Sequence, residues 1–179
     1  MLSDMLLGNR IVMAPMTRNR AAPEGVPSPL MSIHYGQRGD AGLVISESAP
    51  VSAQGVGYPG TPGIYTEEQA QGWRKVTDAV HAKGGHIFAQ LQHCGRISHP
   101  SLQVDEEMPV APSAIKPEGL AVTYGGMQPF VTPRELTTAE IPQVVDQFKR
   151  AAAVAKAAGF DGVETVSYTH LTLPTKRIV

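Results

Sequence analysis

The sequence contains very little cysteine and no long apolar run. Its 179 residues include one cysteine, Cys94, so no internal disulfide can form and a reducing compartment, the cytoplasm, is expected. No segment approaches the roughly 18 consecutive apolar residues that a membrane-spanning helix needs. The first residues have neither a basic stretch nor a small-residue cleavage site, so we expect no signal peptide.

Neither sign of charge is in excess. The chain has 15 lysines and arginines against 16 aspartates and glutamates, a formal net charge of −1. A chain without a basic field is a poor partner for nucleic acid, so we expect none. The histidines match no recognised zinc motif, so we expect no metal. Hydrophobic residues make up 42% of the chain, which is typical of a globular protein with its own core.

Four apolar segments of strand length alternate with helical patterns. We expect strands in residues 9–15, 42–48, 85–93 and 160–164, and helices in residues 28–38, 66–83 and 137–158. Such an alternation is typical of βα units around a parallel sheet, an α/β fold. In sheets of this kind, ligands bind at the carboxyl ends of the strands.

Several local patterns support these helices. Capping boxes begin at Thr66 and Thr137. One face of the first helix is expected to hold Leu30, Ile33 and His34. The third helix has the strongest apolar stripe, formed by Ile141, Val144, Val145, Phe148, Ala152 and Ala155. Residues 94–136 contain six prolines and no convincing element, and a loop of that length is usually functional or has minor structure of its own.

Small polar side chains follow three of the predicted strands. Thr17, Ser48 and Gln90 each stand where an apolar run ends. The Gln90 amide can donate and accept hydrogen bonds in one plane, which suits a flat heterocycle with alternating carbonyl and N–H groups. We therefore expect these three residues to converge on one planar ligand. Cys94 could be a reactive thiol, but a small buried hydrophobe is the favoured interpretation.

Several segments, in this order, resemble the old yellow enzyme family of flavin-dependent ene-reductases: NRIVMAPMTRNR, GLVISES, GYPGTPGIY, GWRKVTDAVHAKGG, QLQHCGRISHPS, PVAPSAI and AGFDGVE. The similarity covers about residues 8–164. It implies the first half of a TIM (βα)8 barrel, about four βα units. It also implies FMN as a non-covalent cofactor, NAD(P)H as reductant, and activated alkenes or nitro compounds as small-molecule substrates.

The resemblance assigns roles to individual residues. Three residues after the first strand would lie against the flavin, namely Pro15, Met16 and Thr17. Ser48 would present its backbone N–H to the ring, Gln90 would hold the pyrimidine edge, and Tyr58 would line the substrate cavity. Arg96 is either a site residue or a partner in a surface salt bridge. Gln92 replaces an aromatic residue of the closest relatives, so a more polar pocket is expected.

The end of the chain departs from the family pattern. The resemblance implies two substrate-binding side chains, a histidine with a histidine or asparagine, and a proton-donating tyrosine beyond Glu164. Tyr168 and His170 do not align with them, so the catalytic residues are not assigned in this chain. We interpret residues 1–164 as the N-terminal half of an FMN-binding barrel and residues 165–179 as a foreign or frameshifted tail.

Half a barrel leaves two strand edges and an apolar interior open to water. We therefore expect an incomplete barrel that self-associates through these edges, binds FMN weakly or not at all, and is inactive alone. Two other functions stay open. One is another βα-barrel enzyme of the phosphate-sugar isomerase or aldolase type, for which Glu47 and Glu164 are the candidate side chains. The other is a non-catalytic half-barrel that acts as a self-association module.

Overall fold

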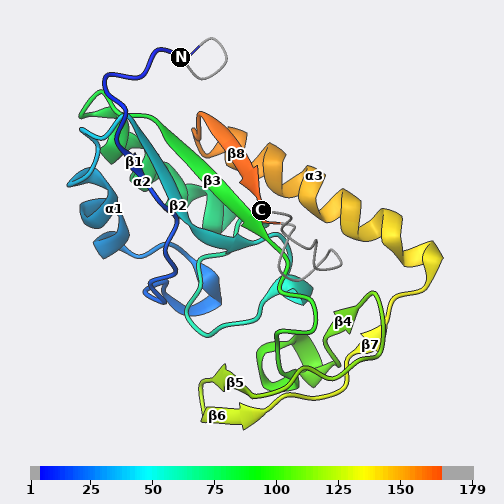
Figure 1. Ribbon diagram of the computed structural model, residues 1–179. Helices are drawn as coiled ribbons and strands as arrows, with labels where there is room; N and C mark the ends of the chain where they lie inside the picture. Colours follow the sequence, from blue (N-terminus) through cyan, green and yellow to red (C-terminus); the bar gives the residue numbers. More distant parts are fainter. Residues whose placement is uncertain (1–4, 167–179) are drawn as a thin grey trace, which may run out of the picture.

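The main sheet consists of four parallel strands in the order β1-β2-β3-β8. These strands are β1 (Val12–Met13), β2 (Leu43–Pro50), β3 (Ile87–Gln92) and β8 (Gly162–Thr165). The computed structural model describes residues 5–166 (Figure 1). Of the predicted foreign tail, Thr165 ends β8 and the N–H of Val166 donates to the carbonyl of Leu91. The rest of the tail lies outside the described residues, so its origin stays a prediction.

Three helices lie along the sheet: α1 (Pro29–Gly36), α2 (Glu67–His81) and α3 (Ile141–Ala157). Alternate residues of β3 face them, and these residues are almost completely buried: Ile87, Ala89 and Leu91. On the other face, the Phe88 ring covers Gly162 so closely that a Cβ there would lie 2.6 Å from it. No helix among the described residues is long and apolar enough to cross a membrane.

The capping boxes form as predicted. Thr66 Oγ1 accepts from the N–H of Gln69, whose Oε1 accepts in turn from the N–H of Thr66, both at 3.2 Å. At the start of the third helical segment, the Glu140 carboxylate accepts from the N–H and the hydroxyl of Thr137, both at 2.8 Å. Both boxes satisfy N-terminal donors that would otherwise lack a partner.

The face of α1 predicted to hold Leu30, Ile33 and His34 is not the face that the helix buries. Leu30 and Ile33 are 66% and 57% exposed, whereas Met31 and Tyr35 are buried. The orientation of α1 follows from its approach to α2, since a Cβ at Gly36 would lie 3.2 Å from the Cβ of Ala79. Tertiary packing, not the local pattern, therefore selects the buried face.

The apolar stripe of α3 is only half used. Ala155 of this stripe is fully buried, as is Ala151 outside it, but Ile141 and Val145 remain 51% and 63% exposed. Figure 1 shows the reason, because the N-terminal half of α3 extends past the end of β8. The sheet of the described residues therefore covers only the C-terminal half of this helix.

The proline-rich segment 94–136 has minor structure of its own. Two residues of β4 (Val110–Ala111) pair in parallel with β7 (Arg134–Glu135), and β5 (Leu120–Thr123) pairs antiparallel with β6 (Gly126–Pro129). This segment leaves the sheet at the carboxyl end of β3 (Figure 1). It therefore lies at the end of the sheet where a barrel binds its ligand.

Candidate functional site

A hydrogen-bonded row of polar side chains crosses three neighbouring strands at their carboxyl ends. Gln90 of β3 is in register with Ser48 of β2 on one side and with Glu164 of β8 on the other. The Ser48 hydroxyl donates to Gln90 Oε1, and Gln90 Nε2 donates to Glu164 Oε2 at 2.8 Å. Gln90 is 8% exposed, so this amide is held almost entirely by protein atoms.

A bulge in β2 produces this alignment. The register between β2 and β3 shifts between Ile45 and Ser48, and the shift places Ser48 opposite Gln90. Inside the bulge, Ser46 Oγ accepts from the Gln90 backbone N–H at 3.1 Å and donates to the Glu47 carbonyl at 2.9 Å. Bulges are common next to active sites because they redirect a side chain, and this one brings Ser48 to Gln90.

Glu47 connects this row to the segment after β1. Its side chain is almost fully buried and accepts from the Arg18 backbone N–H at 3.1 Å and from the Tyr35 hydroxyl at 3.2 Å. The same Tyr35 oxygen accepts from the Glu47 backbone N–H at 2.8 Å. Burial raises the pKa of both Glu47 and Tyr35 above their ordinary values. Glu47, which precedes Ser48, therefore holds the backbone of Arg18, which follows Thr17, next to β2.

The three predicted flavin neighbours after β1 lie on an open segment. Pro15 is half-buried, and Met16 and Thr17 are exposed, Met16 at 61%. Arg18 holds the backbone of this segment to Glu47 and places a guanidinium nitrogen 3.8 Å from the Met16 sulfur. The structure thus brings Ser48 and Gln90 into direct contact. It holds the loop that carries Thr17 at the same end of the sheet.

Tyr58 lies in the loop after β2, not on the sheet. It lines a cavity of about 140 Å³ together with Tyr65, Leu102 and Tyr124. Tyr124 comes from the turn between β5 and β6, and its hydroxyl oxygen accepts from the Gly60 N–H at 3.1 Å. Burial raises the pKa of Tyr58, and the nearby Cys94 adds a smaller increase. Its hydroxyl therefore stays protonated at neutral pH and can donate a hydrogen bond.

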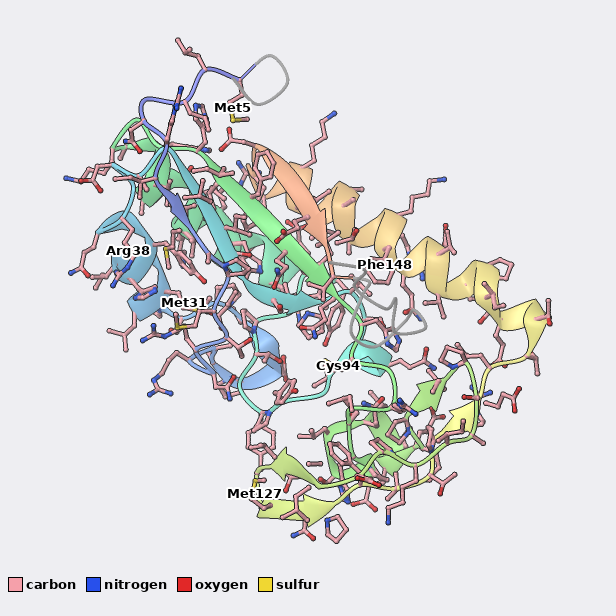
Figure 2. All side chains as sticks on the ribbon, in the orientation of Figure 1. Met5, Met31, Arg38, Cys94, Met127 and Phe148 are labelled. Atoms are coloured by element: carbon pink, nitrogen blue, oxygen red, sulfur yellow. The ribbon has the colours of Figure 1, made fainter. Side chains whose placement is uncertain are left out.

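Cys94 and Arg96 follow β3. Cys94 is 2% exposed, and burial raises its pKa to about 12, which confirms the interpretation as a small buried hydrophobe. In Figure 2 it lies where β3 leaves the sheet. Arg96 donates to the Ile115 carbonyl at 3.4 Å and has no carboxylate partner within the described residues. The alternative of a surface salt bridge for Arg96 therefore has no support.

The chain matches the family model described as NADH:flavin oxidoreductase / NADH oxidase over residues 1–170. It belongs to that family. The chain is 46% identical to 12-oxophytodienoate reductase 7 of Oryza sativa subsp. japonica over 163 residues, 88% of this chain and 41% of that protein. It is 45% identical to flavin oxidoreductase hxnT of Emericella nidulans over 163 residues, 88% of this chain and 42% of that protein.

Solved structures of this family confirm the fold. Morphinone reductase in complex with tetrahydroNAD superimposes with a TM-score of 0.87 at 46% identity, over 96% of this chain and 51% of that one. The old yellow enzyme homologue from Zymomonas mobilis gives a TM-score of 0.87 at 44% identity, over 91% and 46%. The chain spans less than half the length of the curated relatives cited above, and its incomplete TIM barrel agrees with that share.

The donor set of the row fits the ring edge of a flavin, the cofactor of this family. A glutamine amide has two N–H donors and two acceptor sites. Glu164 takes one donor and Ser48 takes one acceptor site, so one of each remains on Gln90. A planar group with a donor and an acceptor side by side is complementary to an adjacent carbonyl and N–H of a pyrimidine ring.

Sequence reasoning missed two contacts of this site. It considered Glu47 and Glu164 only as catalytic groups of another enzyme class, whereas the structure bonds them to Tyr35 and Gln90. Strand alternation could have found the second contact, because Gly162 and Glu164 share a face of β8. The contact between Tyr35 and Glu47 depends on the packing of α1 against the bulge in β2, and no local sequence pattern predicts it.

Proposed function

We propose that this chain supplies the flavin-ring side of an FMN-dependent oxidoreductase. Such an enzyme transfers hydride from NAD(P)H through the flavin to activated alkenes or nitro compounds. The observation that carries the proposal is the row of Ser48, Gln90 and Glu164 at the carboxyl ends of three parallel strands. The similarity to a morphinone reductase solved with tetrahydroNAD supports a nicotinamide reductant.

Each predicted residue has a part in this proposal. Gln90 holds the pyrimidine edge, the Thr17 hydroxyl lies near a ring carbonyl, and Ser48 presents its backbone N–H. Pro15 and Met16 lie against the ring. Bound FMN would supply the hydride chemistry. The donors of this chain would stabilise negative charge on the ring, because fixed donors in a site with little water act strongly on developing charge.

Tyr58 is assigned to the substrate side of the site. Its protonated hydroxyl and its position in a cavity lined by Tyr65, Leu102 and Tyr124 suit a small molecule with a polar group. The cavity is built by loops at the carboxyl end of the sheet, where a barrel receives its substrate.

Taken alone, the chain is proposed to bind FMN weakly and to be inactive. Residues at both edges of the sheet are exposed: Ile11, just before β1, at 69%, Val12 of β1 at 49%, and Val163 of β8 at 41%. These edges support self-association between copies. Residues 1–164 form the half-barrel and residues 165–179 a foreign tail in this proposal. The free, buried Cys94 supports a cytoplasmic location.

A flavin fluorescence titration tests the proposal. FMN should bind the chain weakly but saturably, and Gln90→Leu should weaken binding about fivefold through the loss of ring-edge hydrogen bonds. Gln128→Leu, on the β5–β6 hairpin, is the matched control and should leave the affinity unchanged. Equal FMN binding by the wild-type and Gln90→Leu chains would contradict the assignment. Tight stoichiometric binding would contradict the weak-binding part of the proposal.

The geometry supports this function over an isomerase or aldolase. Both candidate carboxylates of that class already have partners, because Glu47 bonds to Tyr35 and Arg18 and Glu164 bonds to Gln90. A purified chain that takes up no flavin but processes a phosphorylated sugar would favour the other class.

A further inference from the structure

We propose that Glu164 is a positioning residue that fixes which way the Gln90 side-chain amide faces. The inference rests on the proposed function, because it concerns the edge that Gln90 presents to a flavin ring. Gln90 Nε2 lies 2.8 Å from Glu164 Oε2, and Gln90 Oε1 faces the Ser48 hydroxyl. A half-turn of the amide would exchange its oxygen and nitrogen, and would reverse the order of donor and acceptor that the ring meets.

Glu164 is the partner that distinguishes the two orientations. A hydroxyl such as that of Ser48 can donate or accept, so it tolerates either end of the amide. An ionised carboxylate can only accept, so it requires the N–H side of Gln90. In the reversed orientation, two acceptor oxygens would face each other at hydrogen-bond distance. Such an arrangement loses the hydrogen bond and adds repulsion.

The backbone holds Glu164 in place for this task. Its strand pairs with β3 from Gly162 to Thr165, and Glu164 is directly opposite Gln90. Asp161 Oδ2 accepts from the Ile87 N–H at 2.8 Å before the strand begins, and Val166 donates to Leu91 after it ends. The carboxylate therefore projects from a strand fixed at both ends, which favours precise positioning.

The experiment uses lumiflavin and N3-methyl-lumiflavin as ring probes. Both lack the phosphate, so they report only on contacts to the ring, and the methyl group blocks the N–H that a correctly oriented Gln90 would contact. Fluorescence titration of the full 179-residue chain gives the preference for lumiflavin as a ratio of dissociation constants. The variants are Glu164→Ala, Glu164→Gln and, as control, Glu135→Ala on exposed β7.

We expect the wild-type chain and Glu135→Ala to prefer lumiflavin about fivefold, the value of one hydrogen bond. Glu164→Ala should reduce the preference to about half of the wild-type ratio, since Gln90 can then turn freely and half of its population presents the wrong edge. Glu164→Gln should give a similar reduction, because an amide partner accepts either orientation. Far-ultraviolet circular dichroism checks folding, and Glu164→Gln remains informative if the alanine variant unfolds.

The possible failures are distinct. A wild-type preference that persists unchanged in both Glu164 variants would overturn the positioning role and leave the proposed function intact. A wild-type chain that binds neither probe, or binds both equally, would overturn the ring-edge contact of Gln90 and the inference with it. A preference reduced equally in Glu135→Ala would show a general effect of charge and would also reject the inference.

Discussion

At the scale of single residues, the site depends on side chains whose positions are fixed by unusual burial. Glu47 is the main example, since its carboxylate lies 1% exposed beneath the row and holds the segment after β1. Its burial would be costly without partners, and the Arg18 N–H and the Tyr35 hydroxyl provide them. The carboxyl end of the sheet is therefore organised around a carboxyl group that itself need not touch a ligand.

The raised pKa of Glu47 makes stability depend on pH. Because the folded-state pKa lies above the unfolded value, the folded state binds the proton more tightly. The contribution of Glu47 to stability is therefore largest below the unfolded pKa of about 4.3 and falls as pH rises through the folded pKa. In chemical denaturation, Glu47→Gln should remove this fall and should be at least as stable as wild type at pH 7. A wild-type stability that rises across that range, relative to Glu47→Gln, would contradict this assignment.

Gly85 shows how little room some positions leave. It joins α2 to β3, and a Cβ there would collide with the Gly39 carbonyl after α1. Gly85→Ala should therefore lower the free energy of unfolding by about 1–3 kcal/mol, as overpacking usually does. Gly8→Ala is the matched control, because no atom lies within 4 Å of its Cβ position. Urea denaturation of both variants measures the difference, and equal stabilities would reject the predicted collision.

At the scale of elements, the sequence predicted what is local and missed what is not. The strands that carry Gln90 and Ser48 were predicted from their apolar runs. Both capping boxes were predicted from the residue types at the helix starts. The first strand is shorter than expected, because Asn9 Oδ1 accepts from the Gly42 N–H at 2.8 Å in place of a ladder bond. The strands within 94–136 escaped notice because elements of two to four residues are defined by distant pairing.

The cap at Thr66 is a test at this scale. Thr66→Ala should destabilise the chain by about 1 kcal/mol, since the N–H of Gln69 loses its acceptor at the start of α2. Thr132→Ala, an exposed residue outside the helices and strands, should change stability little. Thermal or urea unfolding gives both values. A Thr66→Ala chain as stable as wild type would show that the box does not contribute.

At the scale of the whole molecule, the outer strands of the sheet, β1 and β8, each have an unpaired edge within the described residues. The apolar start of α3 is also exposed. We expect size-exclusion chromatography with light scattering to show a mass that grows with concentration. Val163→Lys should reduce it, because a charged side chain on an edge strand opposes strand pairing. Val122→Lys, on β5, is the matched control for an added lysine. A monomer at all concentrations would contradict the open-edge account.

The convergence of three strand ends on one flat ring is the claim on which the account depends, and the photochemistry of FMN tests it directly. Light-excited flavin oxidises nearby methionines, and two methionines of similar exposure are available. Met16, 61% exposed, is proposed to lie against the ring. Met127, labelled in Figure 2, is 56% exposed and lies on the β5–β6 hairpin. Mass spectrometry after illumination with FMN should show Met16 oxidised well before Met127, and Gln90→Leu should reduce the difference, because it binds FMN more weakly. Equal oxidation of both methionines in the wild-type chain, or Met127 first, would contradict the account.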